Sequence, residues 1–78
     1  MSQILQQLRE ILKEHFLIQS SVVQPSKTFE SDLGMSSLEF TELVVYLEDT
    51  YNIQLSDMDL SRVRNVRDLI WCVEQTVK

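Results

Sequence analysis

Residues that break or cross-link secondary structure are scarce in this chain. Its 78 residues include one glycine, one proline and one cysteine. So few turn formers argue against a turn-rich all-β architecture and against a disordered tail. The single cysteine, Cys72, excludes an internal disulfide and suits a reducing cytoplasm. No apolar run approaches membrane-spanning length and no signal peptide is recognisable, so we expect a cytoplasmic protein without membrane insertion.

Size and charge limit the functions open to the chain. Its length predicts one domain over residues 1–78, and 44% hydrophobic residues are enough for a thin core. The net charge of −5 disfavours nucleic acid as a partner and favours proteins with basic patches. One histidine and one cysteine cannot make a metal-ligand cluster, and no catalytic triad can be assembled. We therefore expect a monomer that binds no metal and is not an enzyme.

Hydrophobic periodicity predicts an all-α fold. Apolar residues recur at helical spacing over residues 2–16, 37–51 and 66–77, and a short helix is expected over residues 57–63. Residues 17–35 form a long connection between the first two helices. The expected core face of the second helix comprises Phe40, Leu43, Val44, Leu47 and Tyr51. Together these elements predict a small four-helix bundle with three longer helices, one short helix and a long first loop.

The stretch DLGMSSLE, residues 32–39, marks the start of the second helix. Ser36 and Glu39 have the spacing of a capping box, in which each side chain accepts a hydrogen bond from the other residue's backbone. This leaves the Ser37 hydroxyl free on the first turn, where an attached phosphate would lie beside unpaired N–H groups and the positive end of the helix dipole. Gly34 is expected to relax the backbone before the helix and to remove side-chain bulk beside Ser37.

The same stretch resembles the acyl carrier protein family, whose signature is Leu-Gly-x-Asp-Ser-Leu followed by an acidic amphipathic helix. Residues 33–38 read LGMSSL here. The resemblance implies that a phosphopantetheinyl transferase attaches 4′-phosphopantetheine from coenzyme A to Ser37, with Ser36 and Gly34 beside it. The arm would hold an acyl group as a thioester. Ser36 stands where the family usually has Asp, which removes a negative charge that the transferase can read.

The side of the second helix that is expected to face solvent carries both apolar and acidic residues. Its members are Leu38, Thr41, Glu42, Val45, Glu48 and Asp49. A solvated face with scattered apolar residues would account for this pattern. The resemblance instead implies a docking surface for the transferase and for acyl-loading, ketosynthase or acyltransferase-type enzymes with basic patches.

Several functions remain open from the sequence. The leading hypothesis is a free-standing acyl carrier protein for fatty-acid, polyketide or related biosynthesis. The alternatives are an aminoacyl or peptidyl carrier of the same fold and a helical interaction module without a prosthetic group. Whether the core shelters an acyl chain, for example near Phe16, Leu47 and Val73, also stays open at this point.

Overall fold

The computed structural model describes residues 2–77, and in these residues the chain is helical with no strand. The elements are α1 (Ser2–Phe16), the 3-10 turn η1 (Ser20–Val22), α2 (Ser37–Tyr51), α3 (Asp57–Leu60) and α4 (Val66–Val77). This confirms the predicted bundle of three longer helices, one short helix and a long first loop. None of the described helices is long and apolar enough to cross a membrane.

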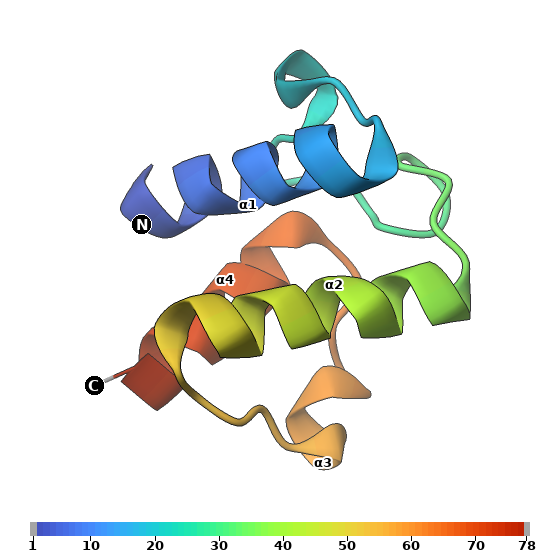
Figure 1. The fold of residues 1–78 in the computed structure, drawn as a ribbon. Coiled ribbons are helices and arrows are strands. Elements are labelled where there is room, and N and C mark those ends of the chain that lie inside the picture. Colours follow the sequence, from blue (N-terminus) through green and yellow to red (C-terminus); the bar gives the residue numbers. More distant parts are fainter. Residues whose placement is uncertain (1, 78) are drawn as a thin grey trace.

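The helices surround a small core (Figure 1). α1 and α2 run in opposite directions, α4 lies behind and between them, and α3 lies on the other side of α2. α1 packs against both α2 and α4, and α3 packs against α4. As a result, α1 ends and α2 begins on one side of the molecule, whereas α1 begins and α4 ends on the opposite side.

Apolar side chains from every long helix fill this core. No polar or charged side chain of the described residues is buried. On α2, Leu43, Val44 and Leu47 are buried and Phe40 and Tyr51 pack against them half-buried, which confirms the predicted core face. The fully buried side chains are Leu8, Leu12, Val23, Leu43, Leu47, Val66, Leu69, Ile70 and Val73.

The long connection between α1 and α2 is fixed by contacts far away in the sequence. The Phe29 N–H donates to the Arg64 carbonyl at 3.1 Å, and the Val66 N–H donates to the Lys27 carbonyl at 2.9 Å. The Phe29 side chain is buried in the core. These bonds attach the connection to the start of α4, so the segment that leads to α2 has a defined path.

The third helix is shorter than its predicted range. It ends at Leu60 rather than Val63, because the next N–H groups make tighter three-residue turns. The Arg62 N–H donates to the Asp59 carbonyl at 3.2 Å and the Val63 N–H to the Leu60 carbonyl at 3.1 Å. Val63 is nevertheless buried, as its place in the apolar pattern predicts.

Candidate functional site

The predicted capping box at the start of α2 is present. The Glu39 N–H donates to Ser36 Oγ at 3.1 Å, and the Ser36 N–H donates to Glu39 Oε1 at 2.9 Å. Ser36 has an extended backbone (φ −77°, ψ 169°), as an N-cap residue requires. The Ser36 hydroxyl is therefore engaged in holding the helix end.

Ser37, by contrast, is the first residue of α2 and is exposed. Within residues 2–77 its hydroxyl makes no hydrogen bond, and neither do the backbone N–H groups of Ser37 and Leu38. Such unpaired N–H groups at a helix start favour a negatively charged group beside them. The site thus offers a free hydroxyl and an environment that suits a phosphodiester.

Gly34 has one of its two expected roles. Its φ of +66° is a left-handed conformation that glycine adopts without strain, so the backbone prediction is confirmed. The prediction that it removes bulk is wrong, because a Cβ at this position would meet no heavy atom within 4 Å. The residue is needed for the turn into Met35 rather than for space.

A carboxylate fixes the loop just before this turn. Asp32 Oδ2 accepts from the Thr28 N–H at 2.8 Å and from Thr28 Oγ1 at 3.2 Å. The Met35 N–H then donates to the Phe29 carbonyl at 2.8 Å. Together these bonds orient the last residues before Ser36.

The loop should respond to acid through Asp32. The backbone hydrogen bond from Thr28 is the largest effect on Asp32 and lowers its pKa. Desolvation opposes it, but the Thr28 hydroxyl and the nearby charge of Lys27 also lower the pKa, which ends below 3.8. A depressed pKa in the folded state means that this bond stabilises the fold above pH 3.8 and loses its effect as the pH falls through the lower folded value.

NMR titration should show the Thr28 amide shift moving with the Asp32 carboxyl below pH 3.8. Asp32→Asn should abolish that movement; an Asp32 that titrates at or above its ordinary value would contradict the account.

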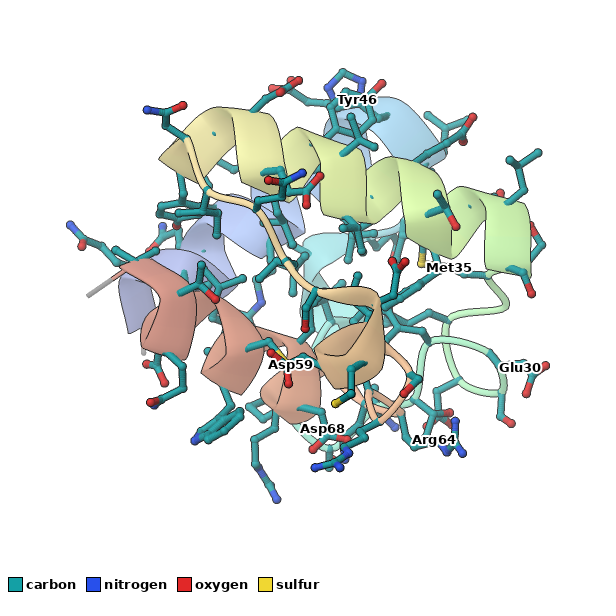
Figure 2. All side chains as sticks on the ribbon, turned by 90° about the horizontal axis from the view of Figure 1, so that it is seen from below. Glu30, Met35, Tyr46, Asp59, Arg64 and Asp68 are labelled. Atoms are coloured by element: carbon teal, nitrogen blue, oxygen red, sulfur yellow. The ribbon has the colours of Figure 1, made fainter. Side chains whose placement is uncertain are left out.

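A groove opens beside Ser37 between α2 and α3, with a volume of about 540 Å³. Figure 2 shows Met35 pointing inward beneath α2, while Glu30 and Arg64 point outward at the edge of the molecule. The polar residues in the groove lining include Ser37, Ser61, Asp57 and Arg64. The apolar floor consists of Phe29, Met35, Phe40, Val44, Leu55, Leu60 and Val63.

The sequence did not locate this groove. Phe16, Leu47 and Val73 are absent from its lining, so this groove is a different place from the one near those residues where the sequence left an acyl shelter open. The sequence signal for it was Met35, an apolar residue directly before the two serines of the loop-to-helix junction. Its burial next to α2 shows that this junction contributes to the groove floor.

The residues expected to dock partners divide into two groups. Leu38, Thr41, Glu42, Val45 and Asp49 are exposed on α2. Glu48 is half-buried, and its Oε2 accepts from the Leu55 N–H at 2.8 Å, which ties α2 to the segment before α3. Among these six residues, Thr41 also makes a side-chain hydrogen bond, to the Ser37 carbonyl at 3.0 Å, but that bond stays within α2 whereas the Glu48 bond reaches beyond it. There is no basic residue within α2. All the charged side chains on its exposed face are therefore carboxylates.

Among residues 2–77 the other reactive side chains form neither a metal-ligand cluster nor an activated thiol. No group of three or more His, Cys, Asp or Glu residues within positions 2–77 could hold a metal ion. Cys72 is buried, and desolvation together with the charges of Asp59 and Asp68 raises the pKa of its thiol. A thiol in this state is a poor nucleophile.

Comparisons with known proteins agree with this geometry. Residues 3–73 match the family model described as "Phosphopantetheine attachment site". The fold is similar to the crystal structure of an acyl carrier protein from Thermotoga maritima. The TM-score is 0.88 at 28% sequence identity, covering 97% of this chain and 88% of that one. The chain therefore belongs to the phosphopantetheine-attachment family of carrier proteins, which bear 4′-phosphopantetheine and are not themselves enzymes.

Proposed function

We propose that the chain acts as a discrete acyl carrier whose prosthetic group is attached at Ser37. The observation that supports this site is the contrast between two adjacent serines. Ser36 Oγ is occupied by the capping box, whereas Ser37 Oγ is exposed and unbonded within the described residues. Ser37 also belongs to the lining of the groove between α2 and α3.

The residues present fit a phosphodiester at this position. In the attachment step a bond forms between Ser37 Oγ and the phosphorus next to pantetheine, and the pyrophosphate bond of coenzyme A breaks. Adenosine 3′,5′-bisphosphate leaves, and the proton of the Ser37 hydroxyl passes to a base of the transferase. The unpaired N–H groups of Ser37 and Leu38 and the N-terminal end of α2 stabilise the negative charge of the ester. When bound, the group supplies the thiol that holds cargo as a thioester. The chain's own part is to position that arm and to present α2 to partner enzymes.

The groove supports an acyl cargo. Its floor is apolar and begins beside Ser37, so an alkyl or similar chain on a bent arm can be shielded there from water. We propose service in fatty-acid, polyketide or related biosynthesis, by a cytoplasmic monomer that contacts neither nucleic acid nor the membrane interior. Its partners would be a phosphopantetheinyl transferase and acyl-loading, ketosynthase or acyltransferase-type enzymes.

An aminoacyl cargo is the second candidate. Three acidic residues, Glu30, Glu48 and Asp57, belong to the groove lining against one basic residue, Arg64. An amino group on the cargo would be favoured by this excess of negative charge. Loading the carrier with matched straight-chain acyl and aminoacyl groups, and comparing how fast each thioester hydrolyses, would separate the two. The cargo that the groove shields should hydrolyse more slowly.

The attachment itself is tested by intact mass before and after incubation with coenzyme A and a broad-specificity phosphopantetheinyl transferase. One phosphopantetheine adduct that fragmentation locates at Ser37 is the expected result. A thiol reagent should then react rapidly with one group per loaded chain and slowly with the unloaded chain, because Cys72 is buried and has a raised pKa.

Ser36→Asp is the matched control for this experiment, since it restores the acidic residue usual in the family. Loading of this variant but not of the parent chain would show that attachment at Ser37 needs a dedicated transferase when the preceding residue is Ser36 instead of Asp. Failure of both chains, with a transferase that loads a reference carrier, would contradict the carrier proposal and favour an interaction module without a prosthetic group.

Docking on α2 predicts a charge effect. Glu42→Lys combined with Asp49→Lys should lower kcat/KM for loading by about tenfold at low salt, because both exposed carboxylates lie on one side of the helix. Added salt should reduce the difference. Glu48 is left unchanged in this variant because its carboxylate binds the Leu55 N–H.

The control for this charge reversal lies on another helix. It is matched to the single variant Glu42→Lys: Glu10→Lys places the same change of charge on an exposed position of α1 and should leave kcat/KM near that of the parent chain. Equal losses from Glu10→Lys and Glu42→Lys would show an effect of net charge alone and would remove the α2 docking hypothesis.

A further inference from the structure

The residue after α1 has an unusual conformation for its type. Leu17 has a φ of 59°, in the left-handed region. Bulky side chains rarely occupy that region, because Cβ then crowds the following carbonyl oxygen. The chain turns sharply here, and the Ile18 N–H donates back to the Leu12 carbonyl at 3.0 Å. The turn ends α1, and glycine or asparagine would make it with less strain.

Packing of the Leu17 side chain against the fold does not offset this strain. It is 88% exposed, the highest value among the large apolar side chains of the described residues. An isolated exposed leucine is ordinary. Here, however, the backbone strain and the exposure of the apolar side chain to water both destabilise the monomer. Strain of this kind is characteristic of sites where the side chain contacts something outside the fold.

Leu17 lies next to a pair of rings that connects α1 to α2. His15 and Tyr46 stack with ring centroids 4.1 Å apart and planes 16° apart, and Phe16 meets Tyr46 edge-on at 6.1 Å. Figure 2 shows Tyr46 on the side of α2 that faces away from α3. Leu38 and Val45 are exposed on α2 itself. α2 thus carries exposed apolar side chains, and the stacked rings join it to the last turn of α1, which Leu17 directly follows in the chain.

This surface lies where an enzyme must come to reach the attachment serine. α1 ends and α2 begins on the same side of the molecule (Figure 1). We propose that Leu17, with the His15–Tyr46 pair, extends the α2 docking surface and that the phosphopantetheinyl transferase buries Leu17 in an apolar pocket while it acts at Ser37. This inference rests on the proposed function.

Charge and shape define the partner surface further. The acidic residues of α2 call for a basic patch over that helix. Beside Leu17 a shallow hollow is lined by Leu17, Ile18, Gln19, Ser20 and Ser21, with Lys13 as its one charged residue. The transferase should therefore be basic over α2, and at the end of α1 it should offer an apolar pocket to Leu17 and no basic group to Lys13.

Leu17→Gly tests the inference with opposite expected effects on stability and docking. Glycine removes the backbone strain, so the melting temperature should rise by about 4 °C. Loss of the apolar contact should lower kcat/KM for loading by about fivefold, chiefly through KM. Leu17→Asn, which also tolerates the left-handed region, should lose docking in the same way. Leu17→Met keeps an apolar side chain and should load like the parent.

Controls separate this inference from the function on which it rests. Trp71→Ala removes a large exposed apolar side chain from α4 and should leave kcat/KM unchanged. Normal loading of Leu17→Gly and Leu17→Asn, with the parent chain still modified at Ser37, would overturn the inference alone. A lowered melting temperature for Leu17→Gly would also overturn it, by showing that Leu17 supports the fold.

Two other outcomes have defined meanings. If the parent chain and Ser36→Asp both fail to load, the proposed function fails and the inference fails with it. If sedimentation shows a dimer that Leu17→Gly dissociates, Leu17 belongs to a contact between two copies of the chain, and the transferase contact is wrong.

Discussion

Ser37→Ala should abolish attachment of phosphopantetheine, with no adduct detectable by intact mass after complete conversion of the parent chain. The reaction needs a free hydroxyl at this position, and the adjacent Ser36 hydroxyl accepts the Glu39 N–H and is committed to the helix end. The fold should be unaffected, since the Ser37 hydroxyl makes no hydrogen bond within the described residues and alanine favours helix. Far-UV circular dichroism of the variant should match that of the parent.

Ser36→Ala is the reciprocal variant. It removes the N-cap oxygen, so the free energy of unfolding should fall by about 1 kcal/mol, while Ser37 remains available for modification. The pair of variants thus separates attachment from capping. An adduct on Ser36 in the Ser37→Ala chain, or loss of loading in Ser36→Ala chains that are still folded, would contradict this assignment.

Leu47→Ala should destabilise the fold more than any substitution on the exposed side of α2. Leu47 is 1% exposed and packs in the core. Truncating a buried leucine costs about 2–5 kcal/mol. A domain of this size has a total stability on the order of 5 kcal/mol, so about 0–3 kcal/mol should remain, and at the upper end of the cost about half of the chains would be unfolded at room temperature. Urea unfolding followed by circular dichroism measures the difference.

The matched control is Leu38→Ala, the same chemical change on the same helix. Leu38 is 69% exposed, and its truncation should alter the free energy of unfolding by less than about 0.5 kcal/mol. Its effect should appear instead in the KM for loading, because Leu38 lies on the proposed docking surface. A larger stability loss for Leu38→Ala than for Leu47→Ala would mean that the orientation of α2 is wrong.

The sequence was informative where local interactions decide the structure. The two sides of α2 followed from helical periodicity, and the capping box followed from the spacing of Ser36 and Glu39. The end of α2 at Tyr51 agrees with the predicted range, and Asn52 follows it with a φ of 54°, in the left-handed region that asparagine tolerates. Each of these depends on residues within a few positions of one another, so the pattern of side chains determines the result.

Long-range contacts were not predictable in the same way. Glu48 was expected on the docking face, but its carboxylate accepts a hydrogen bond from the Leu55 N–H and so has a structural role. No local sequence pattern indicates this hydrogen bond. The groove depends on how α3 is placed beside α2, which the packing of the short helix on α4 decides. The left-handed Leu17 could have been suspected, because no glycine or asparagine follows Phe16 to end α1.

The placement of the chain ends has a consequence for how such a carrier can be tethered. α1 begins and α4 ends on the side of the molecule opposite to the start of α2 (Figure 1). A flexible linker at either end would leave Ser37, the groove and the α2 face unobstructed. Fusion to a partner enzyme through such a linker would raise the effective concentration of the loaded arm at that enzyme to roughly the millimolar range. The same geometry allows the protein to be immobilised on a surface by either end with its attachment site facing the solution.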